Sequence, residues 1–71
     1  MGSSIIRNSV RASRASKGMS QSDLAQKIDA TRQTVAAIEK GDYSPSALLA
    51  LRIAYALEIP FNELFWLEEE K

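Results

Sequence analysis

Apolar side chains recur at helical spacing through the middle of the chain, between residues 20 and 41. They fall at Leu24, Ala25 and Ile28 and then, after a short interruption, at Val35 and Ile38. Spacings of three and four residues place such side chains on one face of a helix. The interruption is Asp29-Ala30. The pattern predicts two short helices joined by a tight turn, with small Ala25 at the point where they approach closely.

The ends of these two helices carry residues suited to capping. Ser20 precedes the first helix and Asp23 follows three residues later, a capping-box pattern with Asp in the usual Glu position. Thr31 is an N-cap candidate for the second helix. Gly41 stands where a left-handed residue would end that helix. The capping residues therefore indicate the same boundaries as the apolar period.

The remainder of the chain predicts three further helices, over residues 9–17, 47–57 and 62–65. Asn8 is the expected N-cap of the helix over 9–17, and Gly18 is expected to end it. Ser46 is the expected N-cap of the helix over 47–57. Phe61 and Leu64 are expected to face inward. The fold class predicted from these periods is all-α, with five helices.

The helix over 47–57 is apolar on two sides. Its expected core face consists of Leu49, Ala50, Ile53 and Leu57. A second stripe, Leu48, Leu51 and Tyr55, follows at spacings of three and four residues. A helix that is apolar on two sides is buried on two sides. The second stripe belongs either to an ordinary wide core or to an interface between subunits.

Four residues remain on the outer face of the helix that follows Thr31 once its core positions are assigned: Arg32, Gln33, Thr34 and Ala37. Their side chains suit the edges of DNA bases. Gln can bind adenine through two hydrogen bonds, Arg can bind guanine or phosphate, and Thr or Ala can contact a thymine methyl group. A helix-turn-helix places its second helix in the major groove in this way. The sequence thus predicts double-stranded DNA as the partner.

Composition narrows the class of protein further. The 71 residues include no Cys and no His, which excludes a disulfide framework and removes common metal ligands and the commonest general base. We therefore expect no enzyme activity, no metal and no cofactor or small-molecule ligand. The length fits one domain with a thin core, which favours oligomers. With no signal peptide or membrane-length apolar run in the sequence, a cytoplasmic protein without membrane contact is expected.

The formal net charge is zero, but the charges are unevenly distributed. Residues 1–57 hold eight basic and four acidic residues, a net charge of +4, whereas residues 58–71 hold one basic and five acidic residues, a net charge of −4. Such asymmetry is typical of a basic binding face with a remote acidic end. The alternative is a surface of solvated charges with no common purpose. Because the mean charge is zero, DNA affinity would have to come from local phosphate contacts.

Several short motifs together resemble the lambda-repressor-like helix-turn-helix family, the Xre/Cro class of small repressors. The resemblance covers about residues 8–66. It is carried by Gly18-Met19-Ser20-Gln21, Leu24-Ala25, Arg32-Gln33-Thr34, Ile38-Glu39-Lys40-Gly41, Tyr43-Ser44-Pro45-Ser46, Ile53-Ala54 and Glu63-Leu64-Phe65. The resemblance implies a five-helix DNA-binding domain over residues 8–66. Residues 1–7 would be an extension or short strand, and residues 67–71 a solvated acidic tail.

The resemblance also implies contacts to the DNA backbone. Gln21 matches a family glutamine that binds phosphate from the start of its helix. The loop after the recognition helix lies against the backbone in similar proteins, so Lys40, Tyr43 and Ser44 are candidate phosphate contacts, with Tyr43 equally suited to packing. Arg14, on the polar face of the first helix with Arg7 and Arg11, completes the expected phosphate set, which is Arg14, Gln21, Lys40, Tyr43 and Ser44.

Apolar residues near the two ends of the chain favour an interface between subunits. Phe65-Trp66-Leu67 is unusually apolar for a terminus. Some short repressors pair their first and last residues as a small β-ribbon, and Ile5-Ile6 against Trp66-Leu67 fits that arrangement. We expect a homodimer with an interface of Leu48, Leu51, Tyr55, Phe65 and Trp66 that binds an inverted repeat, as a repressor. The alternative is a protein-interaction or antitoxin module with the same fold.

Overall fold

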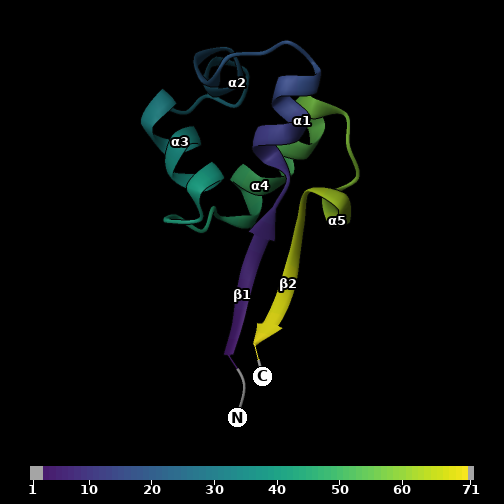
Figure 1. Cartoon of the computed structure of the whole chain (residues 1–71). Coiled ribbons are helices and arrows are strands. Elements are labelled where there is room, and N and C mark those ends of the chain that lie inside the picture. The colour runs from purple at the N-terminus through teal and green to yellow at the C-terminus, as the bar shows by residue number, and fades with distance from the viewer. Residues whose placement is uncertain (1–2, 71) are drawn as a thin grey trace.

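A computed structural model describes residues 3–70, which form five helices and one two-stranded antiparallel sheet. In chain order the elements are β1 (Ser3–Asn8), α1 (Val10–Ser16), α2 (Gln21–Lys27), α3 (Arg32–Lys40), α4 (Ala47–Leu57), α5 (Phe61–Leu64) and β2 (Phe65–Glu70). The helices form a body, and the two strands extend from it as a ribbon, on the side away from α2 (Figure 1). The molecule measures 39 × 21 × 20 Å because of this ribbon.

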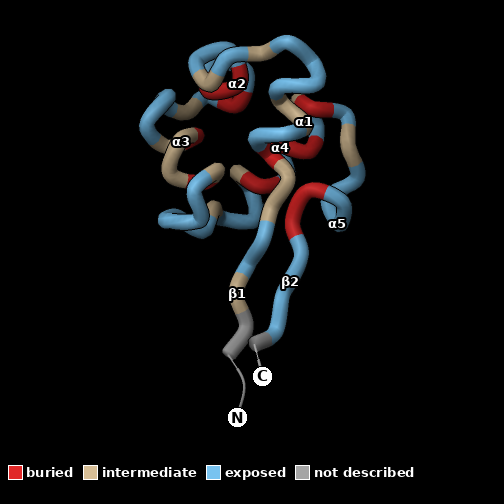
Figure 2. The backbone as a smooth tube through the Cα atoms, in the orientation of Figure 1, coloured by how far each residue is buried: buried red, intermediate tan, exposed pale blue. Residues whose placement is uncertain are grey.

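The core lies between the helices, and α2, α3 and α4 contribute the faces that the apolar period predicted. Its buried members are Val10, Leu24, Ala25, Ile28, Val35, Ile38, Ala50, Ile53, Ala54, Leu57, Leu64 and Phe65. In Figure 2 the buried segments gather inside the body, and the ribbon is mostly exposed. Leu49 is half-buried against this core. Burial of each large aliphatic side chain contributes about 1.5–3 kcal/mol before entropy is counted.

The helix ends follow the predicted capping residues. Thr31 accepts a hydrogen bond from the backbone N–H of Thr34, and Ser46 accepts one from that of Leu49. Gly41 adopts φ +84°, the left-handed conformation that glycine tolerates best. These caps confirm the predicted ends of α3 and the start of α4.

The start of α1 differs from the prediction. The N-cap position is held by Ser9 rather than Asn8, and the helix runs from Val10 to Ser16. Asn8 still serves the helix end, because its Oδ1 accepts a hydrogen bond from the N–H of Val10 at 3.1 Å. Its Nδ2 donates to the carbonyl oxygen of Ile38 at 3.0 Å. Asn8 therefore links the start of α1 to α3.

The ribbon makes the all-α prediction too narrow. Strands β1 and β2 pair along their whole length, with Ile6 opposite Leu67, Ile5 opposite Glu68 and Arg7 opposite Trp66. The Arg7 Nη2 lies 3.0 Å from Glu68 Oε2. The apolar ends do meet, as expected. Residues 68–70, predicted to be a solvated tail, instead continue β2, and the side chains of Glu68 and Glu69 are exposed.

Two aromatic residues differ from the prediction in how far they are buried. Phe61, predicted to face inward, is 44% exposed, whereas Phe65 is buried at 8% exposure. Helix α5 begins at Phe61 and ends at Leu64, so Phe65 already belongs to β2 and turns back into the body. The two rings remain neighbours, with centroids 5.6 Å apart. Phe65 is therefore removed from the predicted dimer interface, because its side chain packs within its own chain.

Candidate nucleic-acid interface

The helix-turn-helix consists of α2, a turn and α3, and its geometry is fixed by local hydrogen bonds. At the start of α2, Ser20 Oγ accepts from the N–H of Asp23 at 2.9 Å, while Asp23 Oδ2 accepts from the N–H of Ser20 at 2.9 Å. This reciprocal pair is the predicted capping box. The hydrogen bond from the backbone N–H of Ser20, with a smaller effect of the Ser20 side chain, holds the pKa of the Asp23 carboxyl below its usual value.

The turn depends on one residue in a left-handed conformation. Asp29 adopts φ +58°, a conformation that Asp tolerates better than most residues do. The N–H of Ala30 donates to the carbonyl oxygen of Ala25 at 2.9 Å, which closes the end of α2. Helix α3 can then start at Arg32 and pack Val35 and Ile38, each 1% exposed, against α2 and the rest of the core.

The four predicted base-reading residues all lie in the first two turns of α3. Arg32 and Gln33 are exposed, while Thr34 and Ala37 are half-buried. Thr34 Oγ1 lies 2.9 Å from Thr31 Oγ1, so its hydroxyl is held at the helix start. The surface therefore presents two long polar side chains beside two small ones.

Three of the predicted phosphate contacts lie at the other end of α3. Lys40 is exposed and forms a loose ion pair with Asp42, with 3.5 Å between Nζ and Oδ2. Tyr43, 46% exposed, and Ser44 follow in the loop before α4. They line a shallow depression between this loop and the ribbon. All three side chains are exposed and accessible to a ligand.

Arg14 and Gln21, the other two predicted phosphate contacts, make hydrogen bonds within the chain. Arg14 Nε donates to Glu39 Oε2 at 2.7 Å, Arg14 Nη2 donates to Glu39 Oε1 at 3.3 Å, and Arg14 Nη1 donates to the carbonyl oxygen of Met19 at 2.6 Å. The exposed fractions of the Arg14 and Glu39 side chains are only 13% and 3%. Gln21 Nε2 also donates to Glu39, at 3.1 Å. Three of the five N–H groups of Arg14 and one of the two amide N–H groups of Gln21 are thus used inside the chain.

The electrostatics of this pair are favourable to the charged form of the arginine. The hydrogen bond to Glu39 raises the pKa of Arg14 above its usual value, and the opposite effect of burial is smaller. A guanidinium and a carboxylate in this side-on geometry form a strong charge-assisted pair. Arg14 therefore joins α1 to α3 beneath the expected DNA surface.

Arg11 was missed as a candidate phosphate contact. It is exposed, and with Arg14, Gln21, Ala36, Glu39 and Lys40 it lines a small depression between α1, α2 and α3. A signal was available in the sequence, because Arg11 lies three residues before Arg14 on the same helix face. The choice between the two arginines required knowing which one Glu39 would pair with.

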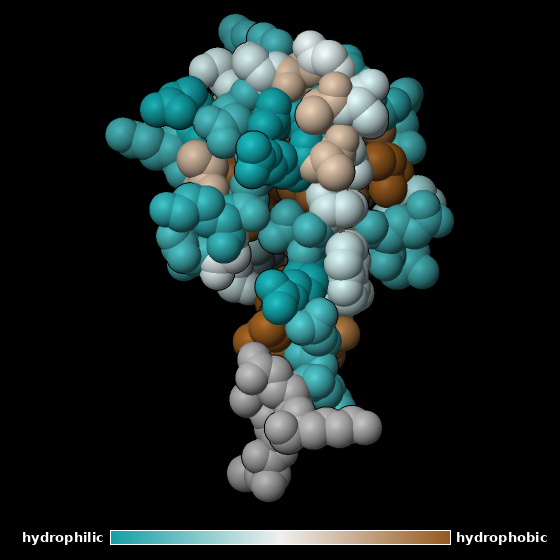
Figure 3. All heavy atoms as spheres, in the orientation of Figure 1, coloured by the Kyte–Doolittle hydropathy of each residue, from teal (hydrophilic) through white to brown (hydrophobic). Residues whose placement is uncertain are grey.

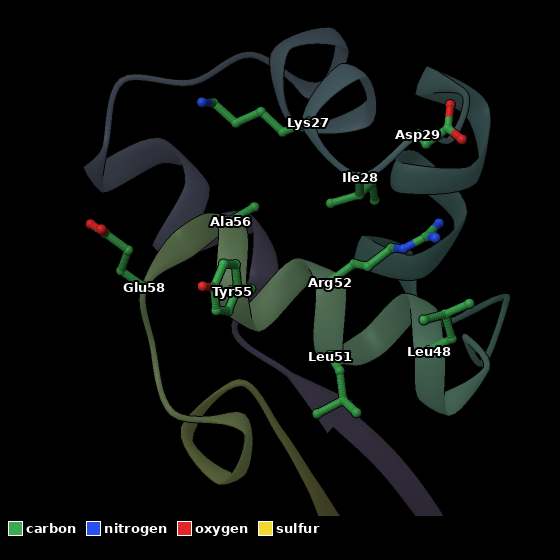
Figure 4. A pocket seen from close by; sticks show the side chains of 9 residues that line it. All are labelled: Lys27, Ile28, Asp29, Leu48, Leu51, Arg52, Tyr55, Ala56 and Glu58. Carbon is green, nitrogen blue, oxygen red and sulfur yellow. The ribbon is translucent and has the colours of Figure 1, made fainter.

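The second apolar stripe of α4 is on the surface rather than in a wide core. Leu48, Leu51 and Tyr55 are 60%, 55% and 90% exposed. They project from α4 beside a depression whose other side is formed by residues of α2 and the turn after it (Figure 4). Trp66, 43% exposed, lies on the ribbon instead. In Figure 3 hydrophobic atoms flank the ribbon, while the visible face of the body is mostly hydrophilic.

These features together define a helix-turn-helix protein, and comparison with known proteins gives the family. A helix-turn-helix family model matches residues 10–64. The uncharacterized HTH-type transcriptional regulator YgzD of Bacillus subtilis (strain 168) is 54% identical over 65 residues, covering 92% of this chain and 98% of that protein. An uncharacterized HTH-type transcriptional regulator of Methanothermobacter thermautotrophicus is 44% identical over 66 residues, covering 92% and 96%.

A solved structure supports the same assignment. The restriction-modification controller protein C.AhdI from Aeromonas hydrophila matches with a TM-score of 0.72 and 35% identity, over 76% of this chain and 78% of that chain. The chain belongs to the Xre/lambda-repressor-like helix-turn-helix family, a family of DNA-binding transcription regulators. Within residues 3–70, no helix combines the length and apolar composition needed to cross a membrane.

Proposed function

We propose that this protein is a sequence-specific transcriptional repressor that binds an inverted-repeat operator as a homodimer. The observation that carries the proposal is the amino end of α3, where Arg32 and Gln33 are exposed on a helix whose opposite face is buried. A recognition helix needs this combination, because its reading side chains must reach base edges while its backbone stays fixed. Repression would follow from a bound dimer excluding other proteins from the same DNA.

Sequence readout is assigned to the first two turns of α3. Gln33 would bind adenine through two hydrogen bonds, and Arg32 would bind guanine or a phosphate. Thr34 and Ala37 are small and half-buried, which suits contact with a thymine methyl group. The acidic side chains of β2 would not oppose this contact, since the ribbon extends away from α2 and from the amino end of α3 (Figure 1).

Phosphate contacts are assigned to the exposed cations and hydroxyls around that surface. They are Arg11, Lys40, Tyr43 and Ser44. We leave Arg14 and Gln21 out of this set, because Arg14 uses three of its five N–H groups and Gln21 one of its two in hydrogen bonds inside the chain. Since the net charge of the chain is zero, these few contacts must supply most of the electrostatic affinity.

The homodimer is assigned to the exposed stripe of α4. Leu48, Leu51 and Tyr55 form a continuous apolar ridge on one helix, and such a ridge can pack against its own copy across a twofold axis. Two recognition helices in successive major grooves would lie about 34 Å apart, which requires an inverted-repeat site. Trp66 on the ribbon is a second candidate surface.

Replacing Gln33 with alanine tests the readout. We expect Gln33→Ala to relax specificity at one base pair of each half-site and to cost about 1–3 kcal/mol of binding free energy. The reason is the loss of two hydrogen bonds to one base edge. The wild type would first be used to select an operator from random duplexes. The affinities of the wild type and of Gln33→Ala are then measured for this operator and for each duplex that differs from it by one base pair.

The matched control is Lys40→Ala at the opposite end of α3. We expect it to weaken binding to all duplexes alike and to reduce the salt dependence, since it removes a phosphate contact rather than a base contact. If Gln33→Ala discriminates among the altered operators as the wild type does, Gln33 is not a reading residue. If the wild type selects no sequence at all, the proposed function is wrong.

A further inference from the structure

We propose that Glu39 is a positioning residue for DNA recognition, acting through the side-chain amide of Gln21 to orient Arg32 at the start of α3. This inference rests on the proposed DNA-reading role of α3. It concerns a connection from the interior of the domain to its surface. None of the three side chains is adjacent in sequence, and the connection exists only because α2 and α3 lie side by side.

The inner end of this connection is rigid. The Glu39 side chain is 3% exposed, and both of its carboxylate oxygens accept hydrogen bonds from Arg14, at 2.7 and 3.3 Å. Arg14 is itself fixed by its third bond, to the carbonyl oxygen of Met19 at 2.6 Å. A carboxylate held on two sides in this way has no freedom to rotate. Its remaining capacity to accept a hydrogen bond points toward Gln21.

The carboxylate determines which way the Gln21 amide faces. A carboxylate paired with a guanidinium only accepts hydrogen bonds, so Gln21 must present its NH₂ group to Glu39. The observed contact is Nε2 to Glu39 Oε1, at 3.1 Å. The amide oxygen of Gln21 then faces outward and can only accept. Glu39 thereby fixes the orientation of the Gln21 amide, so that its oxygen is a hydrogen-bond acceptor at the edge of the proposed DNA surface.

Arg32 meets that acceptor. Its Nη1 donates to Gln21 Oε1 at 3.2 Å, and the contact lies on the exposed side of the domain. A guanidinium carries five N–H donors and no acceptor, so Arg at this position matches the orientation that Glu39 imposes. The other N–H groups of Arg32 stay available for DNA. Gln21 therefore holds the arginine through its amide oxygen.

Holding Arg32 in advance should strengthen DNA binding. An arginine loses rotational freedom when it binds DNA, and an arginine already restrained loses less. Ordering one long side chain beforehand corresponds to roughly 3- to 10-fold in affinity. The gain should appear only at contacts that Arg32 makes, which separates it from a general effect on the fold.

Replacing Gln21 with methionine tests the connection. Methionine keeps the length and helix propensity of the side chain but cannot bond to either neighbour, and the pair of Arg14 with Glu39 remains intact. In the free protein, we expect the side-chain NMR signals of Arg32 to become more mobile. We expect affinity for the selected operator to fall about 3- to 10-fold. In an Arg32→Met background, Gln21→Met should cause no further loss.

The matched control is Gln26→Met on the exposed side of the same helix, which should change neither the Arg32 signals nor operator affinity. Glu39→Gln should mobilise Arg32 as Gln21→Met does, and should add no mobility in the Gln21→Met background. Equal losses of affinity from Gln21→Met with and without the Arg32 guanidinium would mean that Gln21 acts independently of Arg32, which would overturn the proposal.

The free-protein measurement separates this inference from the proposed function. If the wild type selects no operator, the proposed function fails, yet the NMR signals still show whether Gln21 and Glu39 restrain Arg32. If an operator is bound but the Arg32 signals are unchanged in both variants, the positioning role fails and the proposed function stands.

Discussion

Replacing Arg14 with methionine is expected to lower the free energy of unfolding by about 2–4 kcal/mol, because it leaves a buried carboxylate without its cation. Glu39 would keep its hydrogen bond from Gln21 but lose both bonds from Arg14. The carbonyl oxygen of Met19 would also lose its donor. Urea denaturation of the two proteins, followed by circular dichroism at equal concentration, measures the difference.

The expected loss is large for a chain of this size. A domain of 71 residues has a total stability of roughly 4–10 kcal/mol, so Arg14→Met should bring it close to unfolding at moderate temperature. The control is Lys17→Met, which breaks the ion pair with Glu58, where the two side chains are 37% and 82% exposed. We expect that change to be within about 0.5 kcal/mol of wild type. Similar losses in the two variants would show that burial of the Arg14 pair contributes nothing.

Replacing Leu51 with aspartate is expected to convert the proposed homodimer to a monomer and to weaken operator binding by about 100-fold or more. In a twofold interface the new charge is introduced twice, and each copy would be removed from water without a partner. Binding then weakens because each half-site must hold its own protein. The fold should be preserved, since Leu51 is 55% exposed in the single chain. Analytical ultracentrifugation at micromolar concentration gives the mass, and operator titration gives the affinity.

Leu67→Asp is the matched control, because it places the same change on an exposed leucine of the ribbon. We expect it to leave the dimer intact. Loss of the dimer with Leu67→Asp alone would move the interface to the ribbon, near Trp66. A wild type that stays monomeric at these concentrations and on operator DNA would contradict the homodimer, and the α4 stripe would then be a surface for a different protein.

The local features of the fold were predictable from the sequence. Ser20, Thr31, Ser46 and Gly41 act within a few residues of their own positions, so their chemistry can be assigned without knowing the tertiary structure. The apolar periods of α2, α3 and α4 identified their buried faces for the same reason. A terminal ribbon with Ile5-Ile6 against Trp66-Leu67 was also anticipated, although through the family resemblance rather than through local chemistry, and the structure pairs Ile6 with Leu67.

The errors concern residues whose surroundings come from distant parts of the chain. Phe61 and Phe65 are both large, apolar and close in sequence, and nothing local decides which one is buried. The ribbon decides it, because β2 begins at Phe65 and pairs that residue with Asn8. The strand also extends over the acidic residues 68–70, where composition favoured a solvated tail.

The sequence by itself determined that there are five helices, the caps and apolar faces of α2, α3 and α4, and the four side chains offered at the start of α3. These depend on neighbours within about one turn, and such interactions repeat from protein to protein. Only the tertiary structure decided that Arg14 and Gln21 form hydrogen bonds with Glu39, whereas Arg11 and Lys40 stay exposed. The partners are 25 and 18 residues apart, so their contact follows from how three helices pack.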